Sequence, residues 1–354
     1  MSEERIRQVL RRAQAGDALT IGFIGGSITQ GSLAEKTENC YARRVFHWWE
    51  TKFPQAKLNF VNAGIGGTDS YFGVGRCEEE LLSHRPDFVM VDFSVNDEPN
   101  AFYQETYEGL LRNILSFESH PAVLLLYNVF YDTGVTAEPF HKEVAKQYGI
   151  PGISMKDTIY QDLQAGKYTR ESISPDGLHP NDAGHEKVAG IITAYLEQIY
   201  AELSTDKEEQ IQDPYEKLLL LREKQRQPYD LPAPVTKNRF QDTKRIKENW
   251  FGREKGDSLH YEFAGSHLGV QFRKTIRKPA HVVKMVVDQD EANPILLDGN
   301  FQEDWGDCIY LQNVPLETNV NKHTLDLTVI SDNIVDGENV SPFLLYAFFH
   351  NEEE

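Results

Sequence analysis

Hydrophobic residues in the first 200 positions fall into short apolar runs separated by longer amphipathic stretches. Short runs bounded by turn residues are typical of buried strands, whereas apolar residues spaced three and four positions apart indicate helices with one buried face. The predicted strands lie near 19–24, 58–62, 87–93, 122–128 and 150–154. The predicted helices lie at 39–53, 70–84, 101–118, 137–148 and 181–200.

This alternation of strand and helix is typical of a parallel sheet whose strands are joined by crossover helices. The last helix has clear start signals, because Pro180 is followed by Asn181 and Asp182, which are good capping residues. We therefore predict an α/β fold, a three-layer α/β/α sandwich with a five-stranded parallel sheet, over residues 1–200.

The pattern changes after residue 200. Residues 201–245 are rich in Glu, Lys, Gln and Arg, carry a leucine cluster at 218–221 and then three prolines, which predicts a linker with one charged helix. Residues 246–350 consist of short β-branched or aromatic runs separated by Gly, Pro, Asn and Asp, which predicts an antiparallel β-sandwich.

The net charge and the length of the longest apolar run argue against some classes of function. The 36 Lys and Arg against 55 Asp and Glu give a formal charge of −19, which repels nucleic acid and anionic lipid. The longest apolar run, 122–130, is far shorter than the roughly 20 residues of a membrane span. The N-terminus carries no uninterrupted hydrophobic signal, so we expect a cytoplasmic protein.

The cysteines are few and widely spaced, which predicts free buried thiols at Cys40, Cys77 and Cys308.

Chemically useful residues follow four of the predicted elements. The first strand runs into GGSIT, where two glycines allow a tight turn before Ser27, although such a turn is often structural. The second ends in NAGIGG, which offers unshielded amide N–H groups, and the third ends in SVND, which presents the Asn96 carboxamide. The loop before the last helix reads SPDGLHP, and its spacing lets Asp176 reach the Nδ1–H of His179.

Ligands of open α/β sheets bind at the carboxyl ends of the strands, so these groups are expected at one edge. A nucleophile, a base with its orienting acid and several N–H donors are what acyl transfer requires. The blocks GGSIT, NAGIGG, SVND and DGLHP resemble, in order, those of the SGNH (GDSL-like) hydrolases. One departure is Ser94, which stands where that family usually has glycine, and it puts the shape of this loop in doubt.

The resemblance implies a flavodoxin-like catalytic domain, here followed by a jelly-roll-like sandwich. It implies that Ser27 is the nucleophile, that His179 is its base and that Asp176 orients the base. The oxyanion would be bound by the N–H groups of Ser27 and Gly67 and by the side chain of Asn96. It implies neither a metal nor an organic cofactor.

Several other residues invite a functional interpretation. His185-Glu186 lacks the second histidine of a zinc-protease motif, because Ala189 stands at that position. Aromatic and imidazole groups of the first and last helices are predicted to be packing or surface groups: His47, Trp48, Trp49 and His185. Tyr127 and Asn128, at the end of the fourth strand, are candidate pocket-lining residues, whereas Asp97 and Glu98 are interpreted as loop and cap residues.

The family includes lipases, thioesterases, lysophospholipases and carbohydrate acetylesterases. The added sandwich resembles that of bacterial esterases that deacetylate oligosaccharides or polysaccharides, and its aromatic residues Trp250, Phe251 and Trp305 are either sugar-stacking groups or core. No apolar lid is visible. We therefore expect a serine ester hydrolase acting on a small acylated carbohydrate through an acyl-enzyme. A thioesterase, a lysophospholipase, a non-catalytic carbohydrate-binding module and assembly into a homo-oligomer stay open.

Overall fold

The computed structural model describes residues 3–203, 235–239, 250–265, 268–304, 306–314, 316, 322–331 and 340–350. The chain divides into two compact units, residues 1–231 and 232–354. The predicted linker at 201–245 lies mostly outside the described residues, and its stretch 235–239 forms a strand that the sequence did not indicate. The predicted domain boundaries at 200 and 246 stay a prediction.

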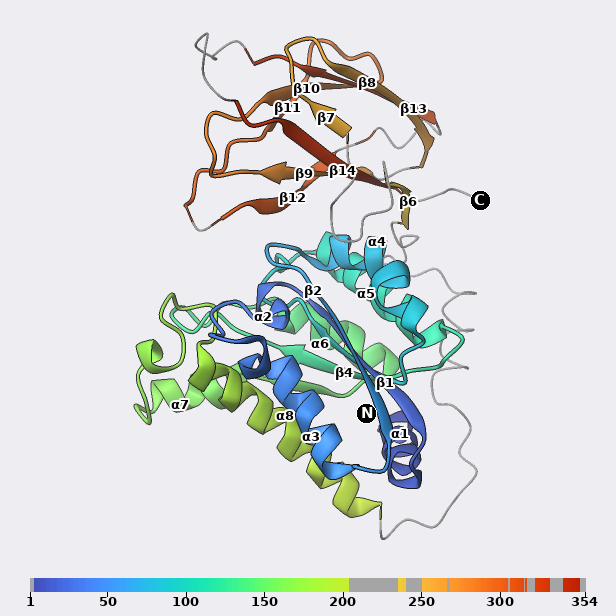
Figure 1. The fold of residues 1–354 in the computed structure, drawn as a ribbon, viewed down its shortest axis with the longest axis vertical. Helices are drawn as coiled ribbons and strands as arrows, with labels where there is room; N and C mark the ends of the chain where they lie inside the picture. Colours follow the sequence, from blue (N-terminus) through green and yellow to red (C-terminus); the bar gives the residue numbers. More distant parts are fainter. Residues whose placement is uncertain are drawn as a thin grey trace. The chain divides into compact units, whose positions relative to one another are not determined.

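The first unit is built on a five-stranded parallel sheet, and each predicted strand is present (Figure 1). The strand order is β2-β1-β3-β4-β5, so the chain leaves β1 first to one side and then to the other. The ends of β1 and β3 therefore form the switch point at which open α/β sheets bind ligands. The strands are β1 (Ala18–Gly25), β2 (Lys57–Gly64), β3 (Phe88–Asp92), β4 (Ala122–Tyr127) and β5 (Gly152–Ser154).

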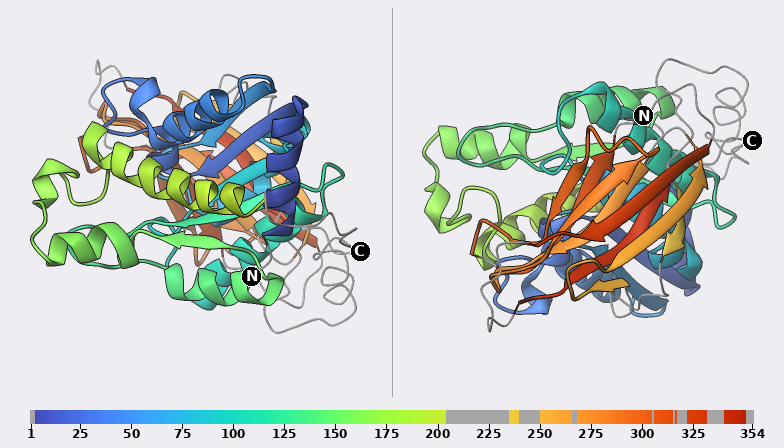
Figure 2. Two further views of the ribbon diagram at one scale, coloured as in Figure 1. Left: turned by 90° about the horizontal axis from the view of Figure 1, so that it is seen from below. Right: turned by 90° about the horizontal axis from the view of Figure 1, so that it is seen from above.

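Helices cover both faces of this sheet, which confirms the α/β prediction. Helices α1 (Glu4–Ala15), α3 (Tyr41–Lys52) and α8 (Asp182–Glu202) lie on one face (Figures 1 and 2). The opposite face carries α4 (Ser70–Glu80), α5 (Ala101–Ser116) and α6 (Glu138–Tyr148). Short helices α2 (Ser27–Gln30) and α7 (Gln161–Gln164) complete the unit.

Helix α1 was not predicted, because its many charges hid a helical pattern. Its side chains Ile6, Val9 and Leu10 are buried against the sheet, whereas its charged residues range from the buried Arg5 to the exposed Arg12. No helix within the described residues has both the length and the apolar character needed to cross a membrane. Cys40, Cys77 and Cys308 are free and buried, as predicted.

The second unit consists of two antiparallel sheets that share one hydrophobic core, which confirms the sandwich (Figure 1). One sheet has the order β11-β10-β13-β8, and the other has the order β12-β9-β14-β6, with β7 paired to β14. The strands are β6 (Val235–Arg239), β7 (Trp250–Gly252), β8 (Ser258–Ala264), β9 (Leu268–Lys274), β10 (Val282–Val287), β11 (Ile295–Asp298), β12 (Cys308–Val314), β13 (Lys322–Val329) and β14 (Phe343–His350).

The sequence did not decide whether the aromatic residues of this unit belong to its core or stack on a sugar. Trp250 is partly buried and packs against the shared core, so it belongs to the sandwich interior. The side chain of Phe251 and the whole of Trp305 lie outside the described residues.

Candidate active site

Ser27 lies at the switch point of the sheet, directly after β1. It is the first residue of α2, so its N–H has no acceptor inside that helix. The preceding Gly26 lies against the carboxamide of Asn96, since a Cβ at this position would sit 2.4 Å from Asn96 Oδ1. Glycine is therefore needed here to leave room for Asn96 beside the serine. Two of the predicted site residues, from β1 and β3, are brought together.

A chain of hydrogen bonds links Ser27 to the last loop of the unit. The Ser27 Oγ lies 2.8 Å from His179 Nε2, and His179 Nδ1 lies 2.6 Å from Asp176 Oδ2. The second carboxylate oxygen accepts the backbone N–H groups of Leu178 at 2.9 Å and His179 at 2.8 Å. With Nδ1–H donating to a carboxylate, Nε2 carries no proton and accepts the hydrogen bond of the Ser27 hydroxyl.

The Asp176 carboxylate keeps its negative charge at this position. Partial burial raises the pKa of Asp176, but the hydrogen bonds from the His179 ring and the two amides lower it, and the net shift is downward. An ionised carboxylate favours the Nδ1–H tautomer and stabilises an imidazolium that forms beside it.

The loop that carries His179 is fixed on both sides. The Tyr131 N–H donates to Gly177 O at 2.6 Å, and Gly177 adopts φ +83°, a conformation that favours glycine. The Asn181 side chain caps α8 by accepting the Gly184 N–H at 3.1 Å. The spacing of Asp176 and His179 is therefore held by the start of α8 and by the loop that follows β4.

Ser27 and the turns after β2 and β3 each carry an N–H donor that has no acceptor in the described part of the chain. The Ser27 N–H, the Gly67 N–H and the Asn96 carboxamide donate to no residue in the described part of the chain. Gly67 adopts φ +70° in the turn after β2. Its neighbour Gly66 donates to Gln30 Oε1 at 2.6 Å, which ties this turn to α2. These three N–H groups are therefore available to an acceptor that the described residues do not supply.

Arg76 of α4 supports the same edge from inside the protein. Its guanidinium is fully buried and donates to Ala63 O at 2.5 Å and to Gly25 O at 3.1 Å, and it pairs with Glu80 at 2.7 Å. It thereby joins the ends of β1 and β2. Sequence reasoning missed Arg76, because a charged residue in an amphipathic helix is usually exposed.

A buried polar network lies beneath α2. Asp92 Oδ2 accepts Thr29 Oγ1 at 3.1 Å and Asn128 Nδ2 at 2.9 Å, and the Thr29 hydroxyl lies 2.8 Å from Tyr41 OH. Burial raises the pKa of Asp92 to about 7. The network fixes the helix that begins with Ser27.

The prediction that Tyr127 and Asn128 line the pocket is wrong. Their exposed fractions are 1% and 0%, and Asn128 is turned toward Asp92. The reason is that β4 lies between β3 and β5 with helices on both faces of the sheet, so both sides of the strand are buried.

Two other residues that the sequence analysis discussed, His185 and Ser94, are buried and hydrogen-bonded. His185 is buried, contacts Tyr41 N and Ser32 O, and burial lowers its pKa to about 4, so it is a neutral packing group. Ser94 is also buried, and its hydroxyl donates to Asn128 O at 2.9 Å. The serine in the family's glycine position is therefore accommodated without an unpaired polar group.

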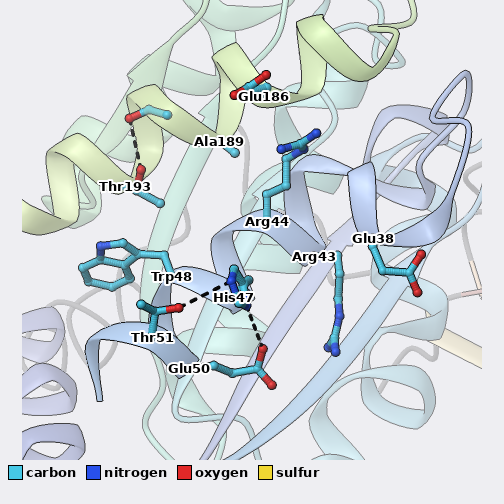
Figure 3. Close-up of a pocket in the computed structure, with 11 residues that line it drawn as sticks. Glu38, Arg43, Arg44, His47, Trp48, Glu50, Thr51, Glu186, Ala189 and Thr193 are labelled. Atoms are coloured by element: carbon cyan, nitrogen blue, oxygen red, sulfur yellow. Dashed lines mark hydrogen bonds and ion pairs between the residues drawn. The ribbon is translucent and has the colours of Figure 1, made fainter. Parts of the chain in front are cut away.

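A cavity of about 690 Å³ lies on the outer surface between α3 and α8 (Figure 3). Arg44, Trp48 and Thr51 of α3 and Ala189 and Thr193 of α8 are among its lining residues. It contains neither the serine nor the histidine of the hydrogen-bonded chain, so it is not the reaction site. Among the described residues, no group of three or more His, Cys, Asp or Glu side chains is arranged to hold a metal ion.

Comparison with known proteins gives the class, a carboxylic ester hydrolase, and the family. Residues 23–187 match the GDSL-like Lipase/Acylhydrolase family. A two-domain esterase active on acetylated mannans is 38% identical, with a TM-score of 0.89 over 100% of this chain and 96% of that chain. This chain belongs to the GDSL-like lipase/acylhydrolase family.

A second structure of the same mannan esterase and one further relative agree with that membership. The mannan esterase co-crystallised with mannopentaose is 37% identical, with a TM-score of 0.86, and the match covers 99% of this chain and 95% of that chain. An acetylxylan esterase from Geobacillus stearothermophilus is 27% identical over 206 residues, which are 50% of this chain and 92% of that esterase. The resemblance in the four sequence blocks is thereby confirmed.

Proposed function

We propose that this chain is a serine esterase that removes acetyl groups from O-acetylated oligosaccharides or polysaccharides. The observation that carries the proposal is the continuous chain from Ser27 Oγ to His179, at 2.8 Å, and from His179 to Asp176, at 2.6 Å. The substrate class is supported by relatives that are named for acetylated mannan and acetylxylan.

In the first step, Ser27 Oγ attacks the carbonyl carbon of the acetyl ester while His179 Nε2 takes the serine proton. Asp176 stays ionised and stabilises the imidazolium without accepting its proton. The carbonyl oxygen becomes an oxyanion that is bound by the Ser27 and Gly67 N–H groups and the Asn96 carboxamide. The bond from carbon to the sugar oxygen then breaks, and His179 returns the proton to the leaving hydroxyl.

In the second step, water attacks the acetyl-enzyme at the same carbon. His179 takes a proton from the water, the same donors bind the new oxyanion, and the bond to Ser27 Oγ breaks. The serine recovers its proton from His179, and acetate leaves. The chain's own side chains and amides thus account for every proton transfer.

Thioesterase and lysophospholipase activities are the enzymatic alternatives. A lysophospholipase holds a long acyl chain, and such substrates require an apolar surface near the serine. In the described part of the first unit, the exposed large hydrophobic side chains are those of Leu33 and Val135. Two separate side chains suit a short acyl group better than a long one. A non-catalytic carbohydrate-binding module is disfavoured because it has no need for the Ser27–His179–Asp176 chain.

The proposal is tested by comparing rates on four substrates at equal concentration. These are acetylated manno-oligosaccharide, acetylated xylo-oligosaccharide, an acyl-CoA and a lysophospholipid, with the Ser27→Ala variant as matched control. We expect acetate release from at least one oligosaccharide to exceed hydrolysis of the other two classes by more than about 10²-fold, and to vanish in Ser27→Ala. Faster cleavage of acyl-CoA or lysophospholipid would contradict the proposed substrate. Equal acetate release by the variant would contradict the proposed nucleophile.

A further inference from the structure

A second aspartate–histidine pair lies buried beside the proposed oxyanion donors. Asp97 Oδ2 is 2.9 Å from His141 Nε2, and the two residues are 6% and 1% exposed. The His141 ring stacks on Tyr107 with the ring centroids 3.6 Å apart and the planes 2° from parallel. The pair has no bond to Ser27 or His179, so the acyl-transfer steps do not use it.

The Asp97 carboxylate joins three parts of the unit. Its Oδ1 accepts the N–H of Ser70, the first residue of α4, at 2.8 Å. Its Oδ2 is bonded to His141 of α6, which anchors it in the interior. Ser70 follows the turn that contains Gly67 by three residues, and Asp97 itself directly follows Asn96. The Asp97 carboxylate is therefore hydrogen-bonded close in sequence to two proposed oxyanion donors, Asn96 and Gly67.

The orientation of the Asn96 carboxamide depends on the backbone of the turn after β3. The Asn96 side chain bonds to no residue in the described part of the chain, so neighbouring side chains do not orient it by hydrogen bonding. Its backbone N–H and that of Asp97 both donate to Phe93 O at 2.9 Å, which makes a tight turn after β3. An oxyanion donor acts only within about 2.7–3.1 Å of the developing charge, so a small shift of this turn weakens it.

We infer that Asp97 and His141 are positioning residues that fix Asn96 for transition-state binding. His141 Nε2–H donates to the Asp97 carboxylate, and this carboxylate in turn holds the loop after β3 to the first turn of α4. Neither side chain touches the substrate. The inference rests on the proposed function, because it concerns the oxyanion donors of that reaction.

The first test replaces His141 by Phe, which preserves a ring to stack on Tyr107 and removes the N–H that Asp97 accepts. We expect kcat for acetyl-ester hydrolysis to fall about 10- to 100-fold, because misplacement of about 1 Å by a remote change has effects of that size. KM should change by less than about twofold, because ground-state binding is not altered. Asp97→Asn, which leaves no unpaired buried charge, provides a second variant that folds if His141→Phe does not, with a smaller loss of kcat.

A double-mutant cycle separates positioning from general damage. If the pair acts through Asn96, the Asn96→Ala/His141→Phe enzyme should be no slower than Asn96→Ala by more than about threefold. The matched control is His323→Phe in the second unit, where His323 Nδ1 lies 2.6 Å from Asp288 Oδ2 and the same carboxylate accepts Thr324 N. That pair contains the same groups, with His323 buried and the Asp288 side chain 34% exposed, and we expect kcat to be unchanged when it is lost.

The outcomes distinguish this inference from the proposed function. Multiplicative losses in the double variant, unchanged kcat in both His141→Phe and Asp97→Asn, or a rise in KM alone would overturn the positioning role while Ser27 and Asn96 stay essential. Normal turnover in Asn96→Ala would overturn the oxyanion role of Asn96 and, with it, this inference.

Discussion

Two aspartate–histidine pairs in the first unit contain the same groups in opposite surroundings. The side chains of Asp176 and His179 are 44% and 24% exposed, whereas those of Asp97 and His141 are 0% and 1% exposed. Only the exposed pair contacts the Ser27 hydroxyl, and in the proposed mechanism only this pair exchanges protons with a substrate. Under the proposed mechanism, solvent exposure and the contact with the Ser27 hydroxyl, and not the residue types, distinguish a pair that transfers protons from a pair that positions other residues.

The comparison is challenged most strongly by replacing the histidine of the exposed pair. His179→Ala removes the base, so kcat for acetyl-ester hydrolysis should fall by about 10⁵-fold or more. The measurement is steady-state acetate release, with His141→Phe assayed in parallel. A loss for His179→Ala no larger than that for His141→Phe would contradict the assignment of His179 as base.

Replacing the aspartate of the exposed pair should have a smaller effect. Asp176→Ala leaves the imidazole able to accept a proton but no longer fixes its tautomer, so we expect kcat to fall by about 10⁴-fold. Partial exposure lets water replace part of the lost hydrogen bonding. The ratio of kcat values for Asp176→Ala and His179→Ala is the readout, and equal or reversed losses would be inconsistent with an orienting role.

Asn96→Ala tests the donor that the buried pair is inferred to hold. Losing one oxyanion donor should lower kcat about 10²–10³-fold while the fold is retained, because the Asn96 carboxamide bonds to no described residue. Hydrolysis of p-nitrophenyl acetate and thermal unfolding are measured together. Turnover near that of the unmodified protein would remove Asn96 from the oxyanion site.

The smallest expected effect concerns stability. Burial raises the pKa of Asp92 from 3.8 to about 7, so the native state binds a proton more tightly than the unfolded chain. The contribution to stability is therefore full below pH 3.8 and is lost as the pH rises toward about 7. We expect Asp92→Asn, which cannot ionise, to lose less stability than the unmodified protein between pH 5 and pH 8. The urea unfolding midpoints of both proteins are measured at pH 5 and pH 8. An equal change of the midpoint in the two proteins would refute this expectation.

Much of the first unit was predictable, because its strands are continuous apolar runs and its helices have regular spacing. The four blocks around Ser27, Gly67, Asn96 and His179 follow strand or loop ends, so the sheet topology alone brings them to one edge. Helix α1 was not predicted, because charged residues stand between its apolar residues.

The support of the site could not be predicted, because it depends on pairs distant in sequence. Asp97 and His141 are 44 positions apart, and no local pattern links them. Arg76 was missed because only the folded chain shows that it reaches Gly25 O and Ala63 O. The error at Tyr127 came from treating a strand end as exposed, although the strand is covered on both faces.

The central claim is that the Ser27 hydroxyl is made nucleophilic by His179. A fluorophosphonate probe reacts covalently with an activated serine, and peptide mass analysis identifies the modified residue. The account predicts one adduct, on the peptide that contains Ser27, formed rapidly in the unmodified protein and absent from both Ser27→Ala and His179→Ala. An adduct on another serine, or equal labelling of His179→Ala, would contradict it.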